Sequence, residues 1–85
     1  MIRYKGGDGS SKEKAIIILG TNNEFEGVDA EYNHTERKSG FFEIKTQLFT
    51  DDGSSKLDCL KVISVNGNKR EIWFDITEFY GREVD

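Results

Sequence analysis

The apolar residues change their spacing along the chain and predict different elements in its two parts. An unbroken β-branched run at residues 15–19 (AIIIL) indicates a strand that is buried on both faces. Residues 21–40 then carry helix signals: acids in the first turns, Arg37 and Lys38 in the last, and Gly40 as a stop. We therefore expect one strand followed by one long helix.

Two sequence signatures indicate where helical turns begin. Ser10 with Glu13 has the form of a capping box and predicts a single helical turn before the first strand. Thr21 with Glu24 forms a second capping box and predicts the start of the long helix. Because Gly27 inside this helix is less favourable than Ala by about 1 kcal/mol, the helix must be supported by packing.

A narrow apolar stripe follows one side of the predicted helix. At about 100° per residue, Phe25, Val28 and Tyr32 fall within an arc of about 60°. We expect this stripe to pack on the sheet. The acidic residues that flank it are Glu24 and Glu31 on one side and Asp29 and Glu36 on the other.

From Phe41 onward the apolar spacing changes to two, which is typical of a strand. The even positions Phe42, Ile44 and Leu48 are expected to face the helix, while the polar residues between them face the other way. The next segment, DDGSSK, has the composition of a turn. An amphipathic strand followed by a turn is therefore expected here.

The stretches LDCLKVISV and KREIWFDI predict two further strands, joined by NGN as a hairpin. A two-residue loop would mix apolar and charged residues on each face. A three-residue loop pairs Val62 with Ile72 and Leu60 with Phe74, which keeps one face apolar, and we predict this loop. The opposite face would carry Trp73 together with Cys59, Ile63, Phe41 and Phe49.

Together these elements predict a two-layer α+β fold in a single domain, residues 1–85. One main helix packs on a mostly antiparallel sheet of about four strands, in the order strand, helix, three-stranded meander and short C-terminal helical turn. A chain of 85 residues has room for only a small core.

Composition indicates the compartment. The lone Cys59 cannot form an internal disulfide, whereas small secreted domains usually need several. The chain has no run of about 20 apolar residues, and its first residues lack the apolar core of a signal peptide. We therefore expect a cytoplasmic protein that does not bind a membrane.

Charge along the chain indicates the kind of partner. Residues 21–36 hold five acids and no Lys or Arg, whereas the rest of the chain holds 11 acids and 12 bases. The excess negative charge therefore lies on the helix, where it would repel nucleic acid and attract a basic protein surface. No nucleic-acid partner is expected.

The pentapeptide DGSSK occurs twice, at residues 8–12 and 52–56. Neither copy has the spacing of a phosphate-binding or calcium-binding loop, and Asp-Gly-Ser is common turn chemistry. The first copy lies in a glycine-rich loop whose backbone a ligand could approach closely. The residues of this candidate ligand site are Gly6, Gly7, Asp8, Gly9, Ser10 and Ser11, with Asp8 and Asp75 as candidates to hold a cation.

No catalytic constellation is recognised. The helix places Glu24 and Glu31 about 10.5 Å apart along its axis, too far for a carboxylate dyad. His34 and Cys59 are expected on different sides of the sheet, which separates a nucleophile from its base. The sequence therefore predicts no metal site and no cofactor.

Four segments resemble a family of small bacterial proteins of unassigned function. These are GGDGSSKEKAIII at residues 6–18, NEFEG at 23–27, AEY at 30–32 and WFDITEFYG at 73–81. The resemblance implies no activity and no catalytic residues. Small acidic proteins of bacteria and phages are often inhibitors or immunity proteins, which is an analogy at the level of size and charge.

We predict a non-enzymatic protein-binding module of the inhibitor or immunity type, whose acidic helix binds a basic partner. The residues predicted to contact the partner are Glu24, Glu31, Asp29, Glu36, Tyr32 and Trp73. One alternative is a small-ligand or cation binder, or a minor enzyme, that uses the Gly6 to Ser11 loop. Another is a structural homodimer built on the Trp73 face, so both monomer and homodimer stay open.

Overall fold

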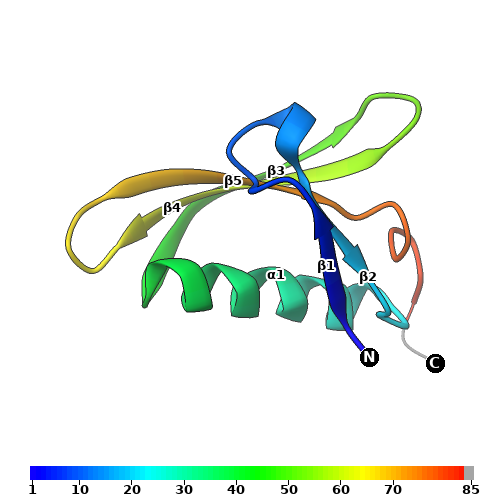
Figure 1. The fold of residues 1–85 in the computed structure, drawn as a ribbon, viewed down its shortest axis with the longest axis horizontal. Coiled ribbons are helices and arrows are strands. Elements are labelled where there is room, and N and C mark those ends of the chain that lie inside the picture. Colours follow the sequence, from blue (N-terminus) through cyan, green and yellow to red (C-terminus); the bar gives the residue numbers. More distant parts are fainter. Residues whose placement is uncertain (84–85) are drawn as a thin grey trace.

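The computed structural model describes residues 1–83, which form a five-stranded sheet with one α-helix across one face (Figure 1). The elements are β1 (Arg3–Gly6), the 3-10 turn η1 (Lys12–Lys14), β2 (Ile16–Leu19), α1 (Glu24–Ser39), β3 (Phe42–Asp51), β4 (Lys56–Ser64) and β5 (Lys69–Asp75). The strand order is β1-β2-β5-β4-β3. Neighbouring strands are antiparallel except β2 and β5, which are parallel.

The prediction of about four strands is wrong, because the sheet has five strands and is mixed, with β2 and β5 forming a parallel pair. The missed strand, β1, is short and polar (RYKG), and only its pairing with β2 makes it a strand. The parallel pairing of β2 with β5 joins distant segments, which local pattern does not reveal. The helix, the β3-β4-β5 meander and a C-terminal helical turn at Ile76–Tyr80 are present.

A β-bulge in β3 overturns part of the predicted facing of that strand. Ile44 pairs with Val62, but Thr46 pairs with Lys61, so Lys45 is an extra residue. Beyond the bulge the side chains exchange faces. Leu48 therefore shares the face of Cys59, away from α1, and Phe49 lies on the α1 side, the reverse of the prediction.

The hairpin between β4 and β5 turns one residue earlier than predicted. Leu60 pairs with Ile72 and Val62 with Arg70, and Ser64 N–H donates to Asn68 O. The loop has three residues as predicted, but they are Val65, Asn66 and Gly67 in place of Asn66, Gly67 and Asn68, so the register moves by two residues. A shift of two keeps each side chain on its face, so the apolar face of the hairpin is as expected.

The start of α1 differs from the predicted capping box. The N-cap is Asn23, whose side chain accepts a hydrogen bond from Glu26 N–H at 2.9 Å. Thr21 is buried instead, and its hydroxyl oxygen has no partner among the described residues. The end agrees with the prediction, since Gly40 has φ +74° and donates to Glu36 O. The helical turn predicted from Ser10 and Glu13 is present as η1, but its N-cap is Ser11, whose side chain makes no capping hydrogen bond.

The helix is rotated by roughly a third of a turn from the predicted orientation. The residues of α1 that are buried on the sheet are Gly27, Ala30, Glu31 and Thr35. The predicted apolar stripe lies largely outside: Phe25 is 74% exposed, and Val28 and Tyr32 are half-buried. The reason is Phe79, whose ring lies against Gly27 and leaves no room for a larger side chain.

The core lies between α1 and the sheet. Its buried members are Ile16, Ile18, Ala30, Leu60, Val62, Ile72, Phe74, Ile76 and Phe79. Two features outside this core matter for function: the outer side of α1, and the part of β5 that β2 does not pair with.

Candidate functional site

The outer side of α1 carries a shallow hollow of about 400 Å³. The residues that line it are Glu24, Phe25, Val28, Asp29 and Tyr32, which we call the outer α1 face. Its apolar centre is unusual for an exposed helix, because a phenylalanine ring that is 74% exposed lies at it. An apolar centre framed by carboxylates is typical of a protein-binding surface.

The polar groups of the outer α1 face are held by the chain itself. Glu24 Oε1 accepts a hydrogen bond from Gly81 N–H at 3.0 Å, and Asp29 Oδ2 accepts one from Asn33 at 3.3 Å. Tyr32 donates its hydroxyl to Gln47 Oε1 at 3.2 Å. These contacts position the two carboxylates and the tyrosine ring at the surface before any partner binds.

The structure brings together only part of the predicted partner site. Glu24, Asp29 and Tyr32 lie on the outer α1 face, and Glu36 is exposed further along the helix. Glu31 is fully buried and cannot contact a partner. The sequence predicts Phe25 in the core, and the structure places it on the surface. The apolar stripe shows which residues share one side of the helix, but not whether that side meets the sheet.

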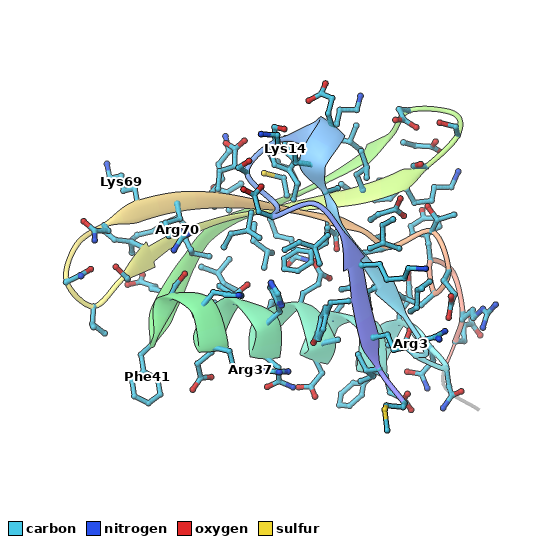
Figure 2. The ribbon with its side chains drawn as sticks, viewed as in Figure 1. Arg3, Lys14, Arg37, Phe41, Lys69 and Arg70 are labelled. Atoms are coloured by element: carbon cyan, nitrogen blue, oxygen red, sulfur yellow. The ribbon has the colours of Figure 1, made fainter. Side chains whose placement is uncertain are left out.

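Trp73 lies on the other side of the sheet and is separated from the outer α1 face. It pairs with Cys59, and its indole N–H donates to Glu71 Oε1 at 2.8 Å. The segment that contains η1 lies over this side of the sheet (Figure 2). Cys59 is only 1% exposed, so the chain itself covers much of the Trp73 face.

Two carboxyl groups lie together in the interior between α1 and β4. Glu31 is fully buried and Asp58 is 6% exposed. Burial raises the pKa of Glu31 to about 10, and the nearby Asp58 carboxylate acts in the same direction. Burial also raises the pKa of Asp58, against the effect of a hydrogen bond that Gln47 donates to its carboxylate at 3.4 Å.

Neither carboxyl oxygen of Glu31 has a hydrogen-bond partner among residues 1–83. Two ionised carboxylates would repel each other in a medium of low dielectric constant, and a neutral Glu31 avoids this repulsion. Glu31 is therefore uncharged at neutral pH. The negative charge of α1 comes from its exposed acids, among them Glu24, Asp29 and Glu36.

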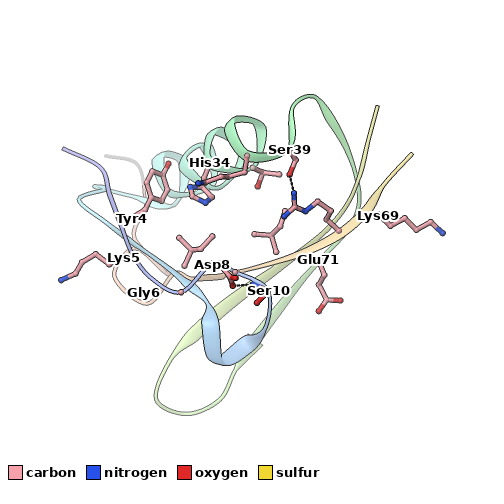
Figure 3. A pocket seen from close by; sticks show the side chains of 16 residues that line it. Tyr4, Lys5, Gly6, Asp8, Ser10, His34, Ser39, Lys69 and Glu71 are labelled. Atoms are coloured by element: carbon pink, nitrogen blue, oxygen red, sulfur yellow. Dashed lines mark hydrogen bonds between the residues drawn. The ribbon is translucent and has the colours of Figure 1, made fainter. Parts of the chain in front are cut away.

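A groove of about 780 Å³ lies on another side of the molecule, between α1, β5 and the glycine-rich loop (Figure 3). We call it the β5 groove. Its walls are residues 69–72 of β5, residues 34, 35, 38 and 39 of α1 and residues 4–10, and Ile16 and Ile72 are its apolar lining. This volume lies in the range of ligand pockets.

Figure 3 shows which side chains face the β5 groove. Tyr4 and His34 project toward it, whereas Lys5, Lys69 and Glu71 point away. The Tyr4 and His34 rings contact each other, with centroids 4.7 Å apart. Burial lowers the pKa of His34, and the nearby positive charges of α1 act in the same direction. The imidazole is therefore neutral at neutral pH.

The predicted ligand loop forms one end of the β5 groove. Gly6, Gly7, Asp8, Gly9 and Ser10 line it, and Ser11 does not. Both copies of DGSSK form side-chain turns, since Asp8 accepts from Ser10 N–H and Asp52 accepts from Ser54 N–H and Ser55 N–H. Only the first copy meets the groove. The groove itself is built from four separate segments, and no local pattern in the sequence indicates it.

The two carboxylates that were candidates to hold a cation, those of Asp8 and Asp75, accept hydrogen bonds from neighbouring residues of the chain. The Asp75 carboxylate accepts hydrogen bonds from the backbone and hydroxyl of Thr77, and Asp8 accepts one from Ser10. No three potential ligands among His, Cys, Asp and Glu of residues 1–83 gather in a way that could hold a metal ion. His34 lies on the α1 side of the sheet and Cys59 on the other, so they do not form a catalytic pair.

Comparisons with family models, with curated proteins and with solved structures find no match to this chain. Its function therefore has to be inferred from its own surfaces. In the part that the structure describes, no helix is both long enough and apolar enough to cross a membrane.

Proposed function

We propose that this protein is a non-enzymatic binding module that uses the outer α1 face to dock on a basic surface of a partner protein. The observation that supports the proposal is the exposed Phe25 ring beside Val28 and Tyr32, with carboxylates on both sides. An exposed aromatic ring can fill an apolar pocket on the partner and act as the anchor of an interface.

The acids around the anchor determine which partners approach. Glu24, Asp29 and Glu36 are exposed, and residues 21–36 contain no Lys or Arg to offset them. Charges at the rim of an interface mainly raise the association rate and exclude partners of like charge. Binding should therefore weaken as salt concentration rises, because exposed charges are screened over about 8 Å at physiological ionic strength.

The test is affinity capture from a lysate of the source organism, with two matched pairs of variants. Phe25→Ser removes the anchor, and Phe41→Ser is its control, because Phe41 is 72% exposed and projects from the opposite end of the helix (Figure 2). Asp29→Lys reverses a charge beside the anchor, and Glu43→Lys makes the same change in net charge on β3.

We expect one basic protein to be captured by the wild type and by both control variants at low salt. Phe25→Ser and Asp29→Lys should capture far less of it. Equal capture by all four variants would contradict the proposal. A second copy of this chain, captured through the Trp73 face, would instead support the homodimer alternative.

A further inference from the structure

The strand β5 lies inside the sheet, yet part of one edge is unpaired. Along its whole length β5 pairs with β4, whereas β2 accompanies it only at Phe74 and Asp75. The backbone N–H of Trp73 points away from β4 and donates to Gly9 O at 2.8 Å. Between this contact and the hairpin, no strand in the described part of the chain pairs with the second edge of β5.

The pattern of an antiparallel ladder gives the direction of the free groups. Alternate residues of a strand point both of their backbone groups to the same neighbour. Since the backbone groups of Trp73 point away from β4, those of Glu71 and Lys69 do so too. Their N–H and C=O groups therefore face the opening of the β5 groove, at the two-residue spacing that another strand would match.

The side chains beside this edge differ along the β5 groove. Near the glycine loop the lining is apolar, since Ile16 and Ile72 lie within 3.0 Å of the position that a Cβ on Gly9 would take. Further along, Arg70 extends toward α1 and donates to Ser39 Oγ at 3.1 Å, and Lys38 also lines the groove. An apolar subsite is thus followed by a cationic one.

We propose that the β5 groove binds an extended peptide segment of another protein, which adds to the free edge of β5 as a strand. Alternate side chains of an added strand face the same way, so the peptide should carry an apolar residue and an acidic residue two positions apart. The apolar side chain contacts Ile16 and Ile72, and the acidic one pairs with Arg70.

The free backbone edge favours a peptide over a free anion. A phosphate or a small carboxylate could pair with Arg70 but would leave the backbone groups of Lys69 and Glu71 without partners. The carboxylate of Asp8, which also lines the groove, would repel a polyanion. Main-chain hydrogen bonds of the kind that a strand supplies are the basis of peptide recognition at sheet edges.

The experiment begins with a displayed library of random heptapeptides, selected on the intact protein, and continues with titration of the enriched peptides. Glu71→Pro removes one backbone N–H from the free edge, whereas Glu71→Ala keeps it, and both variants lose the same carboxylate. Arg70→Gln tests the acidic subsite. Lys69→Gln is its control, because Lys69 points away from the groove (Figure 3). Circular dichroism and thermal melting verify that each variant is folded.

We expect enriched peptides with the spacing of one apolar and one acidic residue, and affinities that fall about tenfold in Glu71→Pro and in Arg70→Gln. Glu71→Ala and Lys69→Gln should stay within about twofold of the wild type. Failure to enrich any peptide would overturn the proposal, as would equal binding to the Pro and Ala variants. Binding of inorganic phosphate in place of the peptides would show an anion site instead. None of these variants touches the outer α1 face, so the two proposals can fail separately.

Discussion

The ring of Phe79 lies so close against Gly27 that a Cβ atom on this glycine would be 2.3 Å from the ring carbons Cε1 and Cζ. This contact holds the C-terminal helical turn on the N-terminal half of α1. It also determines how the helix is rotated, because the smallest residue of α1 faces the sheet side while Phe25 faces solvent. The outer α1 face therefore exists because of a packing contact made elsewhere.

Replacing this glycine tests the contact. Gly27→Ala should lower the free energy of unfolding by about 1–3 kcal/mol, because overpacking outweighs the better helix propensity of alanine. The measurement is urea denaturation followed by circular dichroism. A second substitution, Phe79→Leu, should reduce the effect of Gly27→Ala. If Gly27→Ala alone stabilises the protein, the contact is not as tight as described.

The buried carboxyl pair predicts an unusual pH dependence of stability. The native state keeps the proton of Glu31 to about pH 10, whereas the unfolded chain releases it near pH 4.5. Between these values the unfolded state binds fewer protons, so stability falls as pH rises, by at most about 1.4 kcal/mol per pH unit for one proton. Stability at acidic pH should exceed that at pH 9.

The variant Glu31→Gln should remove most of this slope and raise the melting temperature at neutral pH, because its amide imitates the protonated carboxyl group. The exposed Glu36→Gln on the same helix is the control and should leave the slope unchanged. Melting temperatures over pH 5–9 provide the comparison. The same slope in wild type and Glu31→Gln would show that Glu31 is not the titrating group.

The long helix could be predicted from the sequence because its signals are local: an acidic start, basic residues near the end and Gly40 as a stop. Its rotation could not, because it depends on contact with Phe79 near the other end of the chain. The meander was recognised from its alternation, but the bulge at Lys45 reversed the faces beyond it. No local pattern signals a bulge when the extra residue is exposed.

For the candidate sites too, the sequence predicted the local features and missed those that depend on tertiary contacts. The acidic character of α1 was visible in the sequence, yet Glu31 is buried beside Asp58 and contributes no charge. A helical wheel shows which residues share a side but not which side meets the sheet. The β5 groove depends on where β2 ends beside β5, which is a property of strand pairing and not of any single segment.

The two DGSSK turns should respond differently to substitution. Gly9 and Gly53 both have positive φ, +81° and +91°, so alanine at either position is unfavourable by roughly 1–2 kcal/mol. A Cβ on Gly9 would also lie 2.8 Å from Ile16 Cδ1, whereas a Cβ on Gly53 would meet nothing within 4 Å. Gly9→Ala should therefore destabilise the protein more than Gly53→Ala in urea denaturation. Equal effects would contradict this difference.

Cys59 should be unreactive in the folded protein. It is 1% exposed, and burial raises the pKa of its thiol to about 11, with the Glu71 carboxylate acting in the same direction. The thiolate is the reactive form, so little of it is present at pH 8. A colorimetric disulfide reagent should modify the native protein slowly and the urea-unfolded protein at once. Rapid modification of the native protein would show that the Trp73 face is open at Cys59.

The most direct test of the outer α1 face is site-specific photocrosslinking. The photoreactive analogue p-benzoylphenylalanine would replace Phe25 in one sample and Phe41 in another, two phenylalanines that are 74% and 72% exposed. Both samples would be irradiated in lysate at low salt, and the adducts identified by mass spectrometry. We predict an adduct with a basic protein from position 25 and none from position 41. The same adducts from both positions, or none from position 25, would contradict the role of the outer α1 face.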